Sequence, residues 1–114
     1  MDNKRSIGTA YEEKAVEYLT AKGYRIIKRN FRCRIGEIDI IAKQNDIVVF
    51  VEVKYRKTAS FGYPEEAVSF SKQKIIRKVA EFFLVGEQLS LDTECRFDVI
   101  AILGEEINHI ENAF

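Results

Sequence analysis

The chain has 114 residues, of which 46% are hydrophobic and 32% are charged, and this composition is typical of a water-soluble globular protein. We expect one domain spanning residues 1–114, because this length can bury a hydrophobic core and no linker or repeat interrupts it. No apolar segment approaches the roughly 20 residues of a membrane span, which excludes a membrane-embedded protein, and the first residues lack the apolar core of a signal peptide.

The first predicted element is a helix over residues 7–22, because apolar side chains recur there at helical spacing. Ser6 can act as its N-cap. Glu12 borders the apolar face of this helix, whereas the neighbouring Glu13 faces solvent. A first strand is expected over residues 24–29.

Two apolar runs follow, at residues 36–42 and 47–55, and each has the β-branched composition of a strand. The second run is apolar on both alternating faces, which is typical of a strand covered on both sides. If the Asn-Asp turn at residues 45–46 is a two-residue hairpin loop, Asp39 lies directly opposite Glu52. A four-residue loop keeps this register, whereas a loop of three or five residues breaks it unless a bulge compensates.

The facing acids Asp39 and Glu52 predict a bound cation, because like charges opposite each other in an antiparallel pair are destabilising. Oxygen ligands without His or Cys favour a hard ion such as Mg²⁺ or Mn²⁺. Lys54 projects from the same face as Glu52 and could orient a water molecule or stabilise negative charge on a phosphate. An ordinary ion pair of Lys54 with Glu52 or Glu37 is the alternative, but it leaves Asp39 unexplained.

The rest of the chain completes an α/β fold. The predicted elements are a turn at residues 60–64, a short helical segment from Pro64 to Phe70, a helix over residues 72–84 capped by Ser71, a strand over residues 95–103 and an edge strand over residues 107–112. The lone histidine, His109, is expected at the surface or edge of the sheet. The order is α-β-β-β-α-β-β, a single-domain mixed β-sheet flanked by helices.

The net charge is zero, but the charges are unevenly distributed. Residues 1–78 contain 17 Lys and Arg against 10 Asp and Glu, whereas residues 79–114 contain one Arg against eight acids. This asymmetry predicts a basic surface around the candidate site, and a solvated basic face without a partner is the alternative. The candidate phosphate-binding residues are Arg29, Arg32, Arg34, Arg56, Lys72, Lys74 and Lys78.

Cys33 and Cys95 do not have the spacing of a metal site, so we expect free thiols and a cytoplasmic protein.

Asp39 followed by Glu52-Val53-Lys54 on the next strand resembles the Asp…Glu-x-Lys signature of the restriction-endonuclease-like nuclease superfamily. Longer strings resemble the YraN-like family of small bacterial proteins, from the first helix almost to the end of the chain. These strings are Glu12-x-x-Ala15-x-x-Tyr18-Leu19, Arg29-Asn30-Phe31-Arg32, Gly36-Glu37-Ile38-Asp39-Ile40-Ile41, Val49-Phe50-Val51-Glu52-Val53-Lys54, Phe61-Gly62-Tyr63-Pro64-Glu65-Glu66-Ala67-Val68 and Arg96-Phe97-Asp98-Val99.

The resemblance implies a restriction-endonuclease-like αβββαβ core near the archaeal Holliday-junction resolvases, a divalent metal and a DNA substrate. By position, Asp39 and Glu52 would be metal ligands, Lys54 the water-positioning residue, and Glu12 the acidic helix residue that resolvase-like members add. Ile38 stands where the superfamily often has proline. The related resolvases act as symmetric dimers, so the resemblance also allows a homodimer.

The sequence-based hypothesis is therefore a metal-dependent DNA endonuclease that acts on branched or damaged DNA. Two other classes remain open: a non-catalytic nucleic-acid-binding module that keeps the nuclease fold, and a structural or partner-binding protein that acts through its acidic C-terminal surface. Nothing in the sequence predicts base-specific readout.

Overall fold

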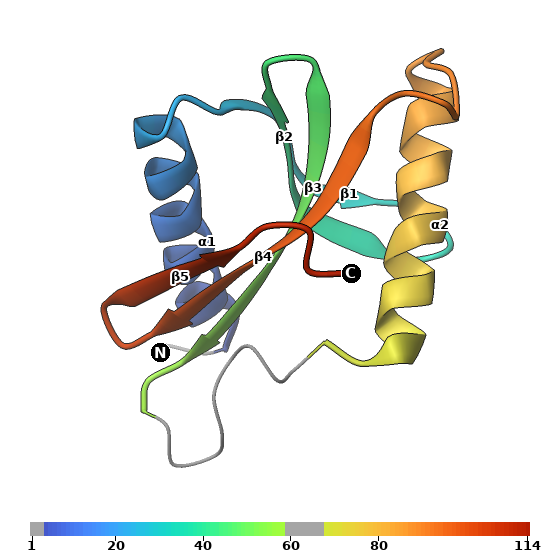
Figure 1. The fold of residues 1–114 in the computed structure, drawn as a ribbon. Coiled ribbons are helices and arrows are strands. Elements are labelled where there is room, and N and C mark those ends of the chain that lie inside the picture. The colour runs from blue at the N-terminus through green and yellow to red at the C-terminus, as the bar shows by residue number, and fades with distance from the viewer. Residues whose placement is uncertain (1–3, 59–67) are drawn as a thin grey trace.

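The computed structural model describes residues 4–58 and 68–114, and for residues 4–6 it describes the backbone alone. Two helices, α1 (Lys4–Ala21) and α2 (Phe70–Gly86), lie on opposite sides of a five-stranded sheet (Figure 1). The strands are β1 (Arg25–Arg32), β2 (Glu37–Gln44), β3 (Ile47–Arg56), β4 (Cys95–Leu103) and β5 (Glu106–Ile110).

The strands follow one another across the sheet in the order β1-β2-β3-β4-β5. The first three form an antiparallel meander, β4 runs parallel to β3 after the α2 crossover, and β5 returns antiparallel to β4. The chain therefore has the predicted α/β architecture, in which an αβββαβ order is followed by one further edge strand. Neither helix in the described ranges is long and apolar enough to cross a membrane.

The central strand β3 is buried on both faces, as its apolar run predicts. Val49, Val51 and Val53 point into the core under α1, whereas Val48 and Phe50 point into the core under α2. Because side chains alternate along a strand, Glu52 and Lys54 lie on the same side of the sheet as Phe50, the α2 side.

The helix boundaries correct two predicted caps. Helix α1 begins before Ser6, which therefore lies inside the first turn. Helix α2 begins at Phe70, and Ser69 rather than Ser71 is its N-cap: Ser69 has extended backbone angles, and its Oγ accepts a hydrogen bond from the Lys72 N–H at 3.1 Å. The predicted turn at residues 60–64 and most of the predicted segment from Pro64 lie outside the described residues.

The predicted hairpin register is confirmed. The β2–β3 ladder runs from Gln44↔Ile47 to Ile40↔Val51, across a two-residue turn. Asn45 in this turn has a positive φ of 54°, a left-handed conformation that asparagine tolerates better than most residues.

The buried Asp98 is the centre of a polar network on the α1 side of the sheet. Its carboxylate accepts hydrogen bonds from Arg96 Nε and Nη2 at 2.9 and 2.8 Å, and His109 Nε2 lies 2.7 Å from Oδ2. Burial alone would raise the pKa of Asp98, but its bonds to His109, Arg96 and the Asn112 N–H outweigh burial and hold that pKa below its usual value. His109 lies on the edge strand β5, as predicted, but it is not a surface residue, because only 3% of its side chain is exposed.

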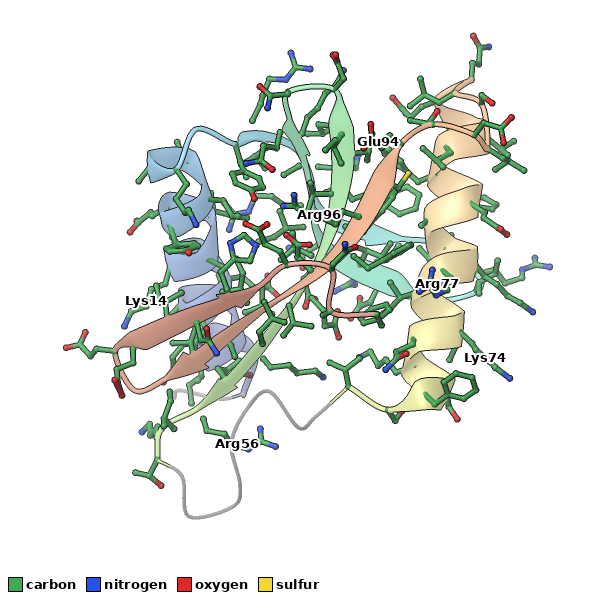
Figure 2. The ribbon with its side chains drawn as sticks, viewed as in Figure 1. Lys14, Arg56, Lys74, Arg77, Glu94 and Arg96 are labelled. Atoms are coloured by element: carbon green, nitrogen blue, oxygen red, sulfur yellow. The ribbon has the colours of Figure 1, made fainter. Side chains whose placement is uncertain are left out.

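Arg96 extends the same network to the early strands. It donates from Nη2 to the Tyr24 hydroxyl at 2.6 Å and from Nη1 to Gln44 Oε1 at 2.9 Å (Figure 2 labels Arg96 near the centre of the molecule). The network therefore links β4 to the start of β1 and to the β2–β3 hairpin.

We expect Asp98→Asn to lower the free energy of unfolding by about 3–5 kcal/mol, because Arg96 would keep a buried charge without its carboxylate. Asp92→Asn, at an exposed turn, is the matched control and should change stability by less than about 0.5 kcal/mol. Urea unfolding of the two variants at pH 7 measures the difference. Equal losses would show that the Asp98 network contributes little to stability.

Candidate functional site

The acids Asp39 and Glu52 lie where β2 and β3 separate. Their ladder ends at Ile40↔Val51, one pair before the acids, and beyond this point the two strands diverge (Figure 1). The Val53 N–H donates to Asp39 Oδ2 at 2.8 Å, so a carboxylate oxygen accepts a hydrogen bond from the neighbouring strand. The fork between β2 and β3 is therefore built around this pair of acids.

The two carboxyl groups interact strongly. Glu52 is 5% exposed, and Asp39 is half-buried. Burial, followed by the negative charge of Glu52, raises the pKa of Asp39 to about 8, against the opposing effect of the Val53 N–H. Without a metal, this raised pKa favours the protonated form of Asp39 near neutral pH.

Two lysines approach Glu52 from different elements. Lys54, on β3, lies on the same face, and its Nζ is 3.6 Å from Glu52 Oε2. Lys72, in the first turn of α2, places its Nζ 2.9 Å from the same oxygen. From the sequence, Lys72 is predicted to bind phosphate, and its contact with Glu52 is not predicted.

Glu12 approaches the fork from α1 but remains separate from the acid pair. Burial raises the pKa of its carboxyl group, against the effects of a hydrogen bond with Asn30 and the charge of Arg29. Its own charge contributes to the raised pKa of Asp39. Within residues 4–58 and 68–114, however, no three His, Cys, Asp or Glu side chains are grouped closely enough to hold a metal. The structure thus joins Asp39 with Glu52 and leaves Glu12 beside them.

Asn30 is a site residue that the sequence analysis missed. It lies in β1 with a φ of 53°, and the flanking pairs Arg29↔Ile40 and Phe31↔Ile38 place it opposite Asp39. It hydrogen-bonds Glu12, and its neighbour Arg29 forms an ion pair with Glu13 at 3.0 Å. Asparagine is unfavourable within a strand, and that local signal could have identified it.

The predicted basic residues are spread over a wider surface than the fork. Arg32 forms an ion pair with Glu37 at 2.9 Å, and Arg56 donates to its neighbouring carbonyl, Tyr55 O, at 3.0 Å. Lys74 points away from the body of the molecule and lies over the Phe70 ring at 4.8 Å (Figure 2). The ion pair of Arg32 with Glu37 is exposed and therefore weak, so Arg32 can exchange its carboxylate partner for a phosphate group. Arg34 is exposed, and Lys78 borders a shallow hollow on the outer side of α2.

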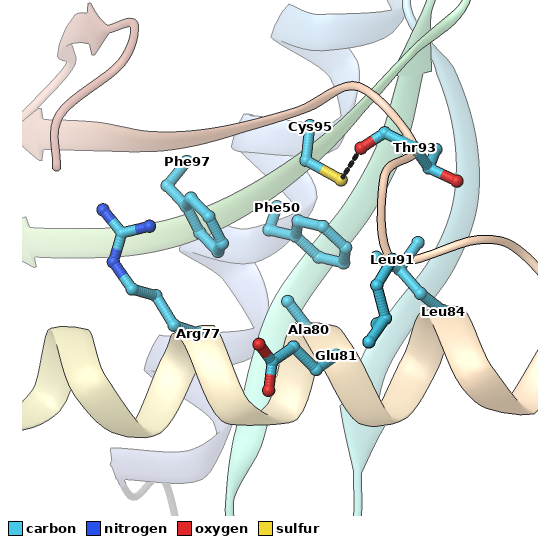
Figure 3. Close-up of a pocket in the computed structure, with 9 residues that line it drawn as sticks. All are labelled: Phe50, Arg77, Ala80, Glu81, Leu84, Leu91, Thr93, Cys95 and Phe97. Carbon is cyan, nitrogen blue, oxygen red and sulfur yellow. Dashed lines mark hydrogen bonds between the residues drawn. The ribbon is translucent and has the colours of Figure 1, made fainter.

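A separate hollow of about 320 Å³ lies between α2 and β4 (Figure 3). It is lined by apolar residues such as Phe50 and Leu84, with Arg77 and Glu81 beside them, and by Cys95, whose thiol donates to the Thr93 carbonyl at 3.2 Å. Its lining does not include Asp39, Glu52 or Lys54, so the candidate chemistry is located in the fork instead.

Comparison with known proteins identifies the family. Residues 11–102 match the description "Uncharacterised protein family UPF0102". A UPF0102 protein of Clostridioides difficile is 50% identical over 116 residues, covering all of both chains. A UPF0102 protein of Lachnoclostridium phytofermentans is 49% identical over 112 residues, covering 98% of this chain and 95% of its own length.

The chain belongs to the UPF0102 family. This confirms the family resemblance drawn from the sequence strings. The segment that matches the UPF0102 family includes Glu12, Asn30, Asp39, Glu52, Lys54 and Lys72. The family description states no activity, so the chemistry of the fork has to be argued from its geometry.

We expect Asp39→Asn to stabilise the metal-free protein at alkaline pH. The folded-state pKa of Asp39, about 8, lies above its ordinary value of 3.8, so the folded protein binds the extra proton and loses stability as pH rises from about 4 through about 8. The asparagine variant has no such loss, so its advantage should grow across that window and exceed about 1.4 kcal/mol, the equivalent of one pKa unit.

Urea unfolding in EDTA between pH 5 and pH 9 measures this advantage. Asp46→Asn, in the exposed hairpin turn, provides the background effect of the same chemical change. A pH-independent difference for both variants would contradict the strong coupling of Asp39 with Glu52.

Proposed function

We propose that the protein is a divalent-metal-dependent endonuclease that hydrolyses phosphodiester bonds in DNA. One observation supports this function above all: Asp39 and Glu52 lie together in the fork of β2 and β3, where burial and the charge of Glu52 raise the pKa of Asp39 to about 8. A cation bound beside Asp39 would favour its charged form. Two hard oxygen donors without a thiolate or imidazole suit Mg²⁺ or Mn²⁺.

The residues of the fork fit such an ion. Asp39 and Glu52 would hold it, with Glu12 close enough to add negative charge from α1. A bound Mg²⁺ or Mn²⁺ lowers the pKa of its water and neutralises charge on the phosphate. Lys54, on the same face as Glu52, would hold the attacking water in position or donate to a phosphate oxygen.

The charges around the fork support a nucleic-acid substrate. The residues that would bind phosphates are Arg29 and Arg32 on β1, Arg34 after it, Arg56 at the end of β3, and Lys74 and Lys78 on α2. Such contacts are independent of base sequence. The resemblance to resolvases therefore leads us to propose recognition of DNA shape, as in branched or damaged DNA, by a protein that acts as a homodimer. The free thiols Cys33 and Cys95 suit a cytoplasmic location.

Incubation with supercoiled plasmid, linear duplex and four-way junction DNA tests the activity. We expect cleavage with Mn²⁺ or Mg²⁺ and none in EDTA. Lys54→Ala should lower the cleavage rate by about 10²-fold or more, because it removes a group aimed at the reacting phosphate. Lys57→Ala, just beyond the end of β3 and exposed, is the matched control.

Melting temperature separates binding of the ion from catalysis. Mn²⁺ should raise the melting temperature of the unmodified protein and of Lys54→Ala, but not that of Asp39→Asn. Metal-dependent DNA binding without cleavage would favour the non-catalytic binding module instead. No effect of Mn²⁺ on melting, together with no cleavage, would contradict the metal site.

A further inference from the structure

The ammonium groups of Lys54 and Lys72 approach the same oxygen of Glu52, and the two lysines differ in distance and in exposure. Lys72 Nζ is 2.9 Å and Lys54 Nζ is 3.6 Å from Glu52 Oε2. The Lys54 side chain is 19% exposed, whereas that of Lys72 is 42% exposed. Lys54 is thus enclosed beside the sheet, while Lys72 reaches the same carboxylate from the solvent side.

Helix α2 fixes the origin of the Lys72 side chain. The Lys72 N–H is bound by the Ser69 cap at 3.1 Å, which sets the first turn against the end of the fork. Lys74, two residues later, is directed outward over Phe70, and Arg77 packs over the Phe97 ring at 4.7 Å. Lys72 therefore differs from these neighbouring cations of α2, because its ammonium group contacts an acid of the fork.

The ammonium group of Lys72 occupies a place suited to a metal cation. The Glu52 side chain is 6% exposed, and a carboxylate buried to that degree is costly unless a positive charge accompanies it. Lys72 supplies that charge at hydrogen-bonding distance. A divalent ion that binds Glu52 has to compete with this contact for the same oxygen.

We infer that Lys72 is an exchangeable cation of the proposed nuclease site. Without metal, it neutralises Glu52. When a divalent ion binds Glu52, the long and partly exposed Lys72 side chain is released and donates to a non-bridging oxygen of the DNA phosphate. Lys54 keeps its place on β3 through this exchange. This inference rests on the proposed function and assigns Lys72 a role in the site, in addition to the general phosphate binding expected of a surface lysine.

The exchange predicts opposite effects of one substitution on two ligands. Lys72→Gln should tighten Mn²⁺ binding to the DNA-free protein by on the order of tenfold, because the ion no longer displaces an ammonium group from a buried carboxylate. The same variant should bind a short DNA duplex in Ca²⁺ more weakly than the unmodified protein does. Lys74→Gln makes the same charge change two residues away and should leave Mn²⁺ affinity unchanged.

Calorimetric titration of Mn²⁺ into the unmodified protein and the two variants measures the first effect, and fluorescence anisotropy of labelled duplex measures the second. A melting curve in EDTA shows whether each variant is folded. Lys72→Arg keeps the positive charge and should bind Mn²⁺ no more tightly than the unmodified protein, which makes the affinity gain specific to charge removal.

The outcomes separate this inference from the proposed function. If the unmodified protein binds Mn²⁺ and cleaves DNA, but Lys72→Gln binds Mn²⁺ no more tightly than Lys74→Gln, the exchange is wrong and the nuclease assignment stands. Tighter Mn²⁺ binding with unchanged affinity for duplex would overturn the phosphate contact. If the unmodified protein neither binds Mn²⁺ nor cleaves DNA, the proposed function fails, and the role of Lys72 fails with it.

Discussion

Two negative groups directly opposite each other on neighbouring strands are unstable unless something positive or a proton lies between them. That constraint governs the centre of this molecule. Here the raised pKa of Asp39 favours its neutral form, and Lys72 and Lys54 approach Glu52, so groups of the chain itself offset both acids. The compensation explains how such a pair is accommodated in a folded protein, and it also shows what a divalent ion would have to replace.

The surrounding fold holds the pair in place from both sides of the sheet. The strands β2 and β3 are registered by their hairpin, and the network of Asp98 and Arg96 fastens that hairpin to β4 through Gln44. On the α2 face of the sheet, Lys72 of α2 contacts Glu52. The Asp98 network and the lysine contacts of Glu52 are thus located on different faces of the sheet.

The features that sequence reasoning predicted are those with a local cause. Apolar, β-branched runs predicted the strands, and the short Asn-Asp turn set the register of the β2–β3 ladder, which ends one pair before Asp39 and Glu52. The features that it missed depend on residues distant in sequence. Lys72 looks like any exposed helix lysine until α2 is packed against the sheet, and His109 is buried because Asp98, eleven residues earlier, lies beside it.

The hydrophobic pattern of the sequence also does not predict the first residue of a helix or an unusual backbone conformation. Ser69 and Ser71 are both acceptable caps, and the direction in which the chain enters α2 decides between them. Asn30 combines a left-handed φ with a hydrogen bond to Glu12. Asparagine within a strand marks this position as unusual, but the residue type alone predicts neither feature.

The segment after β5 crosses from one layer of the molecule to the other. The Asn112 N–H donates to Asp98 on the α1 side, the Ala113 N–H donates to the Phe97 carbonyl at 2.7 Å, and Phe114 stacks on Phe97 on the α2 side. Residues 112–114 thus connect the Asp98 network on the α1 side with the hydrophobic core on the α2 side. Protein engineering of this chain should therefore leave Asn112, Ala113 and Phe114 unaltered.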